Sequence, residues 1–343
     1  MSNKPLRTVI IGFGKIGAGY ADDPVMSRHY PIASHAQALA AHPAFAWEAV
    51  VDPSNSALDN ARKRWSIQYA EKDIDSLAQR YAPEVAVIAT PPQFRAGLIE
   101  KLPTLRAVLV EKPLGLTTQE GSTFLQECCR RQVMVQVNLW RRADTVFRML
   151  ASGGLVERIG RAQAVFGTYG NGLLNNGTHM IDFITMLLGE VSSVQAVSVN
   201  TPPYCAGPLD GDPQIPFVLY LKNGVVAMLQ PLQFEHYREN SLDMWGERGR
   251  LQIAQEGLGV FLFPHCTNRA IQGEFEVACD RPQLLETTVG AALYEIYDNL
   301  ANAIYNEVPL WSPGESALKA ERAVEAIKES ACRKGALIAL ESE

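Results

Sequence analysis

The stretch VIIGFGKIG, residues 9 to 17, places glycines in the spacing G-x-G-x-x-G directly after an apolar run. The first glycine allows a tight turn, the second lets the backbone approach a pyrophosphate, and the third lets a helix pack closely on the strand. The amides at the start of that helix also favour negative charge. An ordinary glycine-rich turn is the alternative. The stretch predicts a dinucleotide-binding turn made of Gly12, Phe13, Gly14, Lys15, Ile16 and Gly17.

The chain around this turn alternates short β-branched runs with longer helical ones. Helical apolar spacing covers residues 54–65 and 118–131. The strands are expected at residues 7–12, 46–52, 85–90, 107–112 and 133–138. Strands of this kind that are joined by helices form a parallel sheet covered on both faces. Residues 1–140 are therefore predicted to form a doubly wound Rossmann domain, which binds ligands beyond the carboxyl ends of its strands.

After about residue 150 the pattern changes to successive strands. They are expected at residues 161–169, 191–199, 216–221, 225–232, 241–246, 250–255 and 258–263, with one helix at 179–189. This predicts an α+β domain over residues 141–343 with an open, mainly antiparallel sheet. Residues 201–216 read as a surface loop, and helical spacing returns at 284–306 and 314–335. The C-terminal helix, residues 313–335, is a candidate to pack back on the first domain.

The composition limits the possible classes of protein. A chain of 343 residues is longer than one core usually supports, which agrees with two domains. The net charge of -6 argues against nucleic acid or an anionic membrane as the main partner. The sequence has no long apolar run of membrane-spanning length and no leader-like start, so we expect a cytoplasmic protein.

The 6 cysteines give no sign of a metal site or a disulfide framework. They lack the paired spacing of zinc sites, and Cys128 and Cys129 are neighbours on a helical stretch. We expect reduced, mostly buried thiols and no bound metal.

Asp52 ends the second predicted strand and is a candidate for the ribose of the cofactor. An acid there can accept hydrogen bonds from the ribose hydroxyls and repel a 2'-phosphate, which favours NAD over NADP. The alternative is a turn or helix-capping acid, because Pro53 and Ser54 follow. Thr90 and Pro91, after the predicted strand at 85–90, are further candidates for cofactor contact.

The distance from the glycine turn to Asp52 is unusually long. Residues 18 to 51 lie between Gly17 and Asp52, against about 20 residues in a minimal unit. Pro24 and Pro31 lie in the excess, and prolines at such places end a helix. We infer a loop inserted after the first helical turn, which carries Arg28, His29 and Tyr30 near the nicotinamide end or the substrate mouth.

The stretch VEKPLG, residues 110 to 115, places Glu111 and Lys112 at the carboxyl end of a predicted core strand. That edge is shared with the glycine turn, so Glu111 is expected to contact the cofactor. An ammonium beside a nicotinamide can polarise a hydroxyl or share in proton transfer. Pro113 would hold the backbone, through a cis bond, so that the amine points inward. A solvated Glu-Lys pair at a strand end is the alternative.

A second constellation lies in GNGLLNNGTHMIDF, residues 170 to 183. If a helix begins near Asn175 or Thr178, the side chains of Asn175, His179 and Asp182 share one face. Oxidation of an alcohol by hydride transfer needs a base for the hydroxyl proton, and histidine titrates in the useful range. A histidine that only packs inside a helix end is the competing interpretation.

Together these motifs resemble the glucose-fructose oxidoreductase, inositol dehydrogenase and MocA family over nearly the whole chain. The matching segments are GFGKIG, VVDPS, ATPPQF, VEKPLG, VNLWRR, GTHMID, MWGERGRL and PGESALKAERAVEAIKESA. The resemblance implies a Rossmann domain followed by an open-sheet domain that supplies the substrate cleft and an oligomer surface. It also implies a homodimer or homotetramer.

The resemblance assigns the family's catalytic lysine to Lys112 and its catalytic histidine to His179. Family members commonly have an aspartate where this chain has Asn175, which can orient a hydroxyl or the imidazole but cannot take a proton. Many relatives have histidine where this chain has Arg95. Arg95, Arg141 and Arg142 are candidates to meet an anionic substrate, and surface arginines are the alternative.

These residues support three hypotheses. The leading one is an NAD-dependent dehydrogenase that acts on a secondary hydroxyl of a sugar, a sugar derivative or a cyclitol. The nucleotide-linked sugars are included, because some relatives that oxidise them resemble this chain in having asparagine at position 175. The second is cleavage of a glycosidic bond with NAD recycled on the enzyme. The third is a non-catalytic dinucleotide sensor, which ranks last because Lys112 and His179 are both present.

Overall fold

The computed structural model describes residues 4–197, 204–205 and 207–340. The chain forms two compact units, the first of Met1–Ala143 with Gly290–Leu318 and the second of Asp144–Val289 with Lys319–Glu343. The first boundary lies close to the predicted one. The difference is residues 290–318, which were assigned to the second domain and instead group with the first. The strand pattern gave no sign of this return, because it depends on which core the helix at its centre covers.

The first unit is built on a six-stranded sheet in the order β3-β2-β1-β4-β5-β6, and every neighbouring pair in it is parallel. This confirms the Rossmann fold. The strands are β1 (Leu6–Ile11), β2 (Phe45–Val51), β3 (Tyr69–Glu71), β4 (Val85–Ile88), β5 (Ala107–Val110) and β6 (Met134–Val137). The short β3 was not predicted.

Helices cover both faces of this sheet. They are α1 (His35–Ala41), α2 (Asn55–Trp65), α3 (Ile74–Ala78), α4 (Leu98–Lys101), α5 (Thr118–Arg130) and α9 (Ala292–Asn306). Short 3₁₀ turns lie at Gly19–Asp22, Met26–Arg28, Pro92–Phe94, Trp140–Ala143 and Val289–Ala291. The helix α10 (Gly314–Cys332) begins in the first unit, to which its residues up to Leu318 belong.

Alternate residues of each strand enter two separate cores. Ile10 and Leu109 pack in a core that also contains Ile296 of α9, while Ile11 and Val110 pack in the opposite one. Successive side chains of a strand point to opposite faces, so a strand that is apolar throughout needs a cover on both sides. Because α9 supplies part of one cover, a segment far along the chain completes the first unit.

The predicted inserted loop is present, and it interrupts a helix. The backbone N–H of His35 bonds to the carbonyl of Ile16 at 3.0 Å, and that of Ala36 bonds to Gly17 at 2.9 Å. These bonds stand where the carbonyls of Ile16 and Gly17 would accept i→i+4 bonds in an uninterrupted helix, so α1 continues the helical turn that starts after the glycines. The excess length before Asp52 is therefore an excursion that leaves the helix and returns to it.

The second unit contains a ten-stranded, mostly antiparallel sheet that follows the order β16-β15-β14-β13-β7-β12-β11-β8-β18, with β17 paired to β15. The pair of β7 and β12 is parallel. The strands are β7 (Ala162–Tyr169), β8 (Val191–Ala196), β11 (Phe217–Leu221), β12 (Val226–Pro231), β13 (Ser241–Gly246), β14 (Gly249–Ala254), β15 (Gly259–Thr267), β16 (Phe275–Val277), β17 (Gln283–Leu284) and β18 (Ile338–Ala339). This confirms the predicted open sheet.

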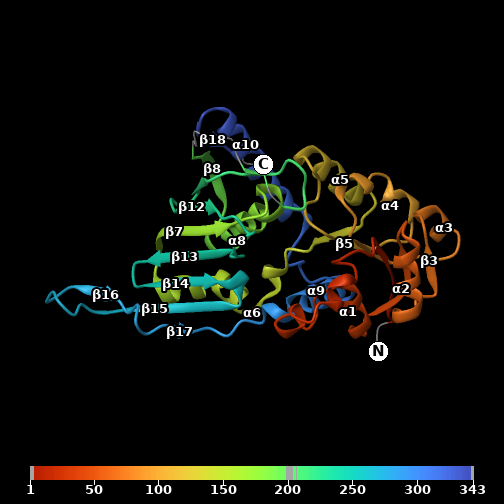
Figure 1. Cartoon of the computed structure of the whole chain (residues 1–343), viewed down its shortest axis with the longest axis horizontal. Helices are drawn as coiled ribbons and strands as arrows, with labels where there is room; N and C mark the ends of the chain where they lie inside the picture. Colours follow the sequence, from red (N-terminus) through yellow and green to blue (C-terminus); the bar gives the residue numbers. More distant parts are fainter. Residues whose placement is uncertain (1–3, 198–203, 206, 341–343) are drawn as a thin grey trace. The chain divides into compact units, whose positions relative to one another are not determined.

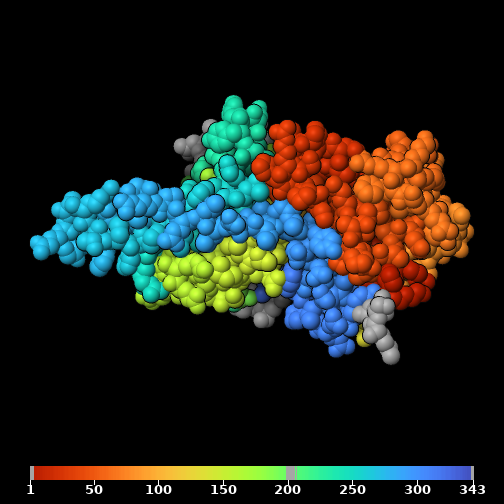
Figure 2. All heavy atoms as spheres, turned by 90° about the horizontal axis from the view of Figure 1, so that it is seen from below, coloured from red at the N-terminus to blue at the C-terminus, as the bar shows by residue number. Residues whose placement is uncertain are grey.

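The helical segments of the second unit precede or interrupt its strands. They are α6 (Thr145–Met149), α7 (Leu155–Ile159), α8 (Thr178–Leu188) and the part of α10 from Lys319 on, which precedes β18. The unit also has π-helical turns at Leu150–Gly154 and Leu173–Gly177 and a 3₁₀ turn at Gln255–Gly257. The hairpin of β15 and β16 extends beyond the rest of its sheet (Figures 1 and 2).

The expected surface loop at 201–216 is only partly described, because residues 201–203 and 206 lie outside the described residues, as do residues 198–199 of a predicted strand. In the described part, β9 (Tyr204–Cys205) pairs with β10 (Pro213–Gln214). Asp212 and Gln214 are buried, so the segment is not simply a surface loop.

The thiol prediction was wrong in one respect. Cys128 is buried, but the other cysteines are exposed. All are free thiols, as expected. In the described ranges no helix is long and apolar enough to cross a membrane.

Candidate active site

The carboxyl ends of β1, β4 and β5, which are neighbours in the sheet, gather the predicted cofactor residues at one edge of the first unit. The glycine turn follows β1, Thr90 and Pro91 follow β4, and Glu111 and Lys112 follow β5. Asp52 follows β2, which flanks β1. The sequence motifs are therefore brought together by the strand order.

The glycine turn has the geometry that a dinucleotide needs. Gly12 has a φ of +92°, and a Cβ on it would lie 2.9 Å from the backbone of Ala89. A Cβ on Gly17 would lie 2.6 Å from the carbonyl oxygen of Gly12, so helix and turn touch there. A Cβ on Gly14 would meet nothing within 4 Å, which leaves an open approach to the backbone. These are the three tasks expected of the motif.

Two buried oxygens near this edge are also consistent with a polar ligand. Thr90 Oγ1 and Asn138 Oδ1 have no hydrogen-bond partner within the described part of the chain. Buried polar atoms are normally paired, so an unpaired atom near a candidate site is informative. The residues at this edge thus fit a bound dinucleotide.

The carboxylate of Asp52 is already tied to the turn. Its Oδ2 accepts from the backbone N–H of Phe13 at 2.7 Å, and its Oδ1 accepts from the backbone N–H of Ser54 at 2.8 Å. Each carboxylate oxygen can accept more than one hydrogen bond. The turn-acid interpretation therefore holds, and capacity remains for ribose hydroxyls.

The Lys112 segment is held by a buried arginine. The Lys112–Pro113 peptide bond is cis. The guanidinium of Arg95, which is 3% exposed, donates to the carbonyls of Pro113 at 2.6 Å and Leu114 at 3.1 Å, and to those of Thr90 and Glu111, both at 2.8 Å. This placement argues against the expected contact of Arg95 with an anionic substrate, and it is not a surface arginine either. Arg95 instead joins the end of β4 to the end of β5.

Glu111 lies in a buried hydrogen-bonded network. Its Oε1 is 3.0 Å from Nε2 of His35 and accepts from the amide of Asn138 at 2.6 Å. On the other side of the ring, His35 Nδ1 is 2.8 Å from the hydroxyl of Tyr297. Burial acts to raise the pKa of Glu111, but the hydrogen bond and charge of His35, the amide of Asn138 and the charge of Lys112 outweigh it and hold that pKa below its usual value.

The two other candidate arginines follow β6 in the 3₁₀ turn at Trp140–Ala143. Arg141 is buried, with its guanidinium carbon 4.3 Å from the ring centre of Trp140. Arg142 is partly exposed and donates to the carbonyl of Trp311 at 3.4 Å. Arg142 is the better placed of the two to meet a ligand from solvent.

The second constellation lies in the other unit. Within residues 172 to 184, all of which are described, Asn175 and His179 are partly exposed while the rest are buried. They belong to a π-helical turn and to the first turn of α8, as the expected helix start near Thr178 requires. Asp182, the third predicted member, is buried. Lys112 and His179 lie in different units.

The start of this helical segment is held by Asp212, which the sequence did not single out. Its carboxylate accepts from the backbone N–H groups of Leu174 and Asn175, each at 2.9 Å. A Cβ on Gly172, whose φ is +96°, would lie 2.1 Å from Asp212 Oδ2, so the approach requires glycine. Burial raises the pKa of Asp212, and the bonds from Leu174 and Asn175 oppose that shift.

Sequence reasoning missed His35, Asn138, Tyr297 and Asp212. His35 directly follows the inserted loop and opens α1, and Asn138 follows the last parallel strand, so both had a signal in their position. Tyr297 and Asp212 had none, because only the folded chain brings them to their partners.

The comparison with protein families decides the identity of the chain. Residues 6–139 match the family described as an oxidoreductase family with an NAD-binding Rossmann fold. Residues 167–339 match the C-terminal alpha/beta domain of the same family. The chain belongs to the Gfo/Idh/MocA oxidoreductase family. The expected cofactor, NAD, is that of the family's Rossmann domain.

Curated relatives share limited identity with this chain. Trans-1,2-dihydrobenzene-1,2-diol dehydrogenase of Oryctolagus cuniculus is 31% identical over 34% of this chain and 40% of its own length. Levoglucosan dehydrogenase of Pseudarthrobacter phenanthrenivorans is 25% identical over 65% of this chain and 70% of its own. Inositol 2-dehydrogenase/D-chiro-inositol 3-dehydrogenase of Lacticaseibacillus casei is 28% identical over 52% and 55%.

Solved structures of Gfo/Idh/MocA proteins share the fold over the full chain. A levoglucosan dehydrogenase in complex with NADH superposes with a TM-score of 0.77 at 18% identity, covering 99% of this chain and 100% of that one. The WlbA dehydrogenase of Bordetella pertussis, in complex with NADH and UDP-GlcNAcA, gives 0.73 at 18% identity with the same coverage. At such identities the likeness supports the fold alone.

Proposed function

We propose that this chain is an NAD-dependent dehydrogenase that oxidises a secondary hydroxyl of a sugar, a sugar derivative or a cyclitol. The observation that carries the proposal is the position of Lys112 at the same sheet edge as a glycine turn with an open approach at Gly14. A cation beside a nicotinamide site can act on an alcohol oxygen. The names of the curated relatives, which are dehydrogenases of levoglucosan, of an inositol and of a dihydrobenzenediol, agree with this substrate class.

In the proposed reaction Lys112 and His179 act on the same substrate hydroxyl. Lys112 donates a hydrogen bond to the substrate oxygen, and His179 accepts the hydroxyl proton. Asn175 orients the hydroxyl or the imidazole, since an amide cannot take the proton. Bound NAD supplies the acceptor for the hydride. Arg142 remains a candidate for an anionic group on the substrate.

The cofactor contacts follow from the first unit. The amides that follow Gly12 and Gly14 would hold the pyrophosphate, and Thr90 and Pro91 would lie along the cofactor at the end of β4. Asp52 would accept from the ribose hydroxyls and disfavour a 2'-phosphate, which predicts a preference for NAD over NADP.

The test is a spectrophotometric screen for nicotinamide reduction. Purified protein receives NAD or NADP with free sugars, cyclitols, sugar phosphates or nucleotide sugars. For a substrate that responds, Lys112→Met and His179→Ala should each lower kcat on the order of 100-fold or more, because each removes a group that acts on the reacting oxygen. Binding of NAD, followed by protein fluorescence, should change little.

Lys101→Met is the matched control, because Lys101 is an exposed lysine of the same unit, paired with Asp75. Strong turnover by Lys112→Met would remove Lys112 from the reaction. Release of an aglycone without net NADH would favour the NAD-recycling mechanism. NAD binding without turnover on any substrate would favour the sensor.

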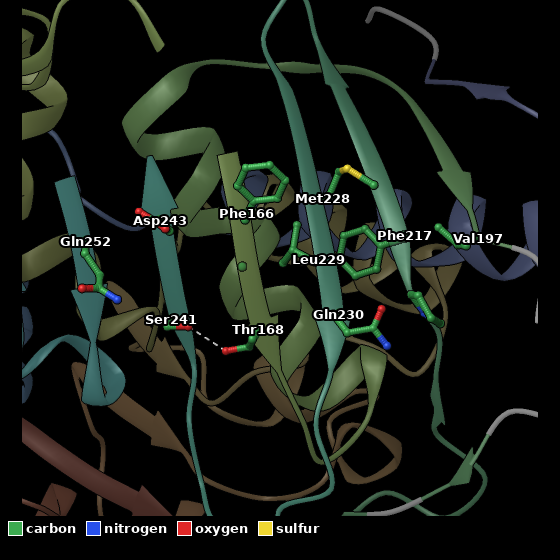
Figure 3. Close-up of a pocket in the computed structure, with 12 residues that line it drawn as sticks. Phe166, Thr168, Val197, Phe217, Met228, Leu229, Gln230, Ser241, Asp243 and Gln252 are labelled. Carbon is green, nitrogen blue, oxygen red and sulfur yellow. Dashed lines mark hydrogen bonds between the residues drawn. The ribbon is translucent and has the colours of Figure 1, made fainter. Parts of the chain in front are cut away.

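We also propose a homodimer or a larger homo-oligomer built through the open face of the second unit's sheet, here called the open sheet face. Phe166, Met228 and Val197 are 48%, 47% and 43% exposed on it. They line one hollow with Thr168, Gln230, Ser241, Asp243 and Gln252 (Figure 3). The alternating residues Val165, Leu242 and Met244 do not line this hollow and are buried. Exposed apolar groups that gather in this way are typical of an interface.

A further inference from the structure

The unexplained groups of the first unit are the buried ionisable side chains behind Lys112. The imidazole of His35 has no exposure, and it lies between Glu111 and Tyr297, which is itself fully buried. These groups come from α1, from the end of β5 and from α9, together with Asn138 after β6. Buried polar groups of this kind are costly unless each is paired, so their joint placement needs a reason.

The contacts of this network fit an ionised Glu111. With Glu111 ionised, its carboxylate only accepts, so His35 Nε2 is the donor that faces it, and the Asn138 amide donates to the same oxygen. The Tyr297 hydroxyl is hydrogen-bonded to Nδ1, the other nitrogen of the His35 imidazole. Two donors aimed at Glu111 keep its carboxylate ionised inside the protein.

The charge on Glu111 acts on its neighbour in the chain. Lys112 is among the groups that hold the pKa of Glu111 down, after burial, His35 and Asn138. The attraction is reciprocal, because it favours the ionised form of both groups. The proposed function needs Lys112 as a hydrogen-bond donor to the substrate oxygen, and an ammonium has no lone pair and therefore only donates.

We infer that His35 is a positioning residue which, held by Tyr297, keeps Glu111 anionic beside Lys112 and thereby keeps Lys112 in its ammonium form. This inference deepens the proposed function and rests on it for the purpose of the ammonium. The network is a fixed support and not a proton route to solvent, because on its far side it ends at the buried hydroxyl of Tyr297. The network also constrains the inserted loop. After the loop, the chain must place His35 where its backbone N–H bonds to the carbonyl of Ile16.

The test reads the charge of Lys112 without any substrate. Lysines are reductively methylated with ¹³C-formaldehyde, and the Lys112 resonance is assigned by its absence in Lys112→Met. Its titration midpoint is then followed by NMR in the wild-type chain, His35→Leu and Glu111→Gln. Because each substitution removes the anion or its support, the midpoint should fall by about one pH unit or more in both.

His42→Leu is the matched control. His42 is a buried histidine at the other end of α1 that faces Asp298, at 3.5 Å, and packs on Phe45 and Tyr294. The same substitution there disturbs the same core without touching Glu111, so the Lys112 midpoint should stay where it is in the wild-type chain. Tyr297→Phe removes one hydroxyl and should move the midpoint in the same direction as His35→Leu, by less.

Circular dichroism shows which variants are folded. If His35→Leu does not fold, Glu111→Gln and Tyr297→Phe carry the test. An unchanged Lys112 midpoint in folded Glu111→Gln would overturn the inference, and so would an equal shift in His42→Leu. Neither outcome depends on turnover. A failure of the proposed function, seen as an active Lys112→Met, is therefore distinguishable from a failure of this network.

Discussion

At the scale of single residues, Arg95 illustrates how a buried charge can serve the backbone of a site. Its guanidinium donates to carbonyls on both sides of Lys112, those of Glu111 and Pro113, and to that of Thr90. A buried cation is tolerated only where it is hydrogen-bonded, and carbonyl oxygens that lose such a donor are left unpaired. We therefore expect the loss of Arg95 to lower the free energy of unfolding.

Arg95→Met should lower the free energy of unfolding by roughly 2–4 kcal/mol, because several buried carbonyls lose their donor at once. Urea denaturation of the two proteins measures the difference. The control is Arg62→Met, since Arg62 is half exposed and donates to one carbonyl, that of Ala70. Its loss should be about 1 kcal/mol or less. An equal decrease in the free energy of unfolding in the two variants would show that the buried hydrogen bonds of Arg95 stabilise the protein no more than the bond of Arg62.

At the scale of elements, two helix starts position the candidate site. The first follows the glycine turn, and the excursion of residues 18 to 34 leaves it without changing the register of His35. The second is the π-helical turn before α8, which presents Asn175 and His179. The N–H groups at the start of a helix have no partner within it, so an outside acceptor such as Asp212 decides how firmly that start is held.

Asp212→Ala should loosen the start of this second helical segment. The backbone N–H groups of Leu174 and Asn175 lose their acceptor, so their hydrogen exchange should become faster. The free energy of unfolding should fall by roughly 1–3 kcal/mol. Hydrogen-exchange mass spectrometry of peptides over residues 172–180 measures the change.

Tyr169→Phe is the control for Asp212. The Tyr169 hydroxyl binds the same segment of chain at Ile215, through bonds of 2.7 and 2.8 Å, but does not contact the helix start. Its loss should leave the exchange of Leu174 and Asn175 as in the wild-type chain. Fast exchange in both variants would mean that the whole segment, and not the carboxylate of Asp212, protects these amides.

At the scale of the whole molecule, the large sheets of the two units differ in how far their faces are covered. The parallel sheet of the first unit is closed on both faces, and α9 supplies part of one of them. The sheet of the second unit leaves the open sheet face with its exposed Phe166 and Met228. A second copy of the chain is the cover we propose.

The paired substitution Phe166→Glu with Met228→Glu should therefore convert the oligomer to a monomer, because like charges would meet across the face. Light scattering coupled to size-exclusion chromatography measures the mass. Ile271→Glu is the control, since Ile271 is 58% exposed in the same unit but lies between β15 and β16 and does not line the hollow. A wild-type protein that is already monomeric would contradict the proposal outright.

The sequence by itself determined the elements whose patterns are local. The glycine turn, the parallel strands, the open antiparallel sheet and the motif around Lys112 are all legible in residues 9–17, 85–138 and 161–263, because strand periodicity and turn chemistry act over a few residues. The inserted loop was also legible, from the length before Asp52 and its prolines.

Only the tertiary structure decided which distant residues meet. Arg95 was expected to contact the substrate, but its side chain instead donates to the carbonyls of Glu111 and Pro113 after β5. Asp212 and Tyr297 reach their partners across long stretches of chain. The physical reason is that a buried charge or an unpaired helix start takes whichever partner the packed core places within hydrogen-bond distance, and sequence spacing carries no record of that choice.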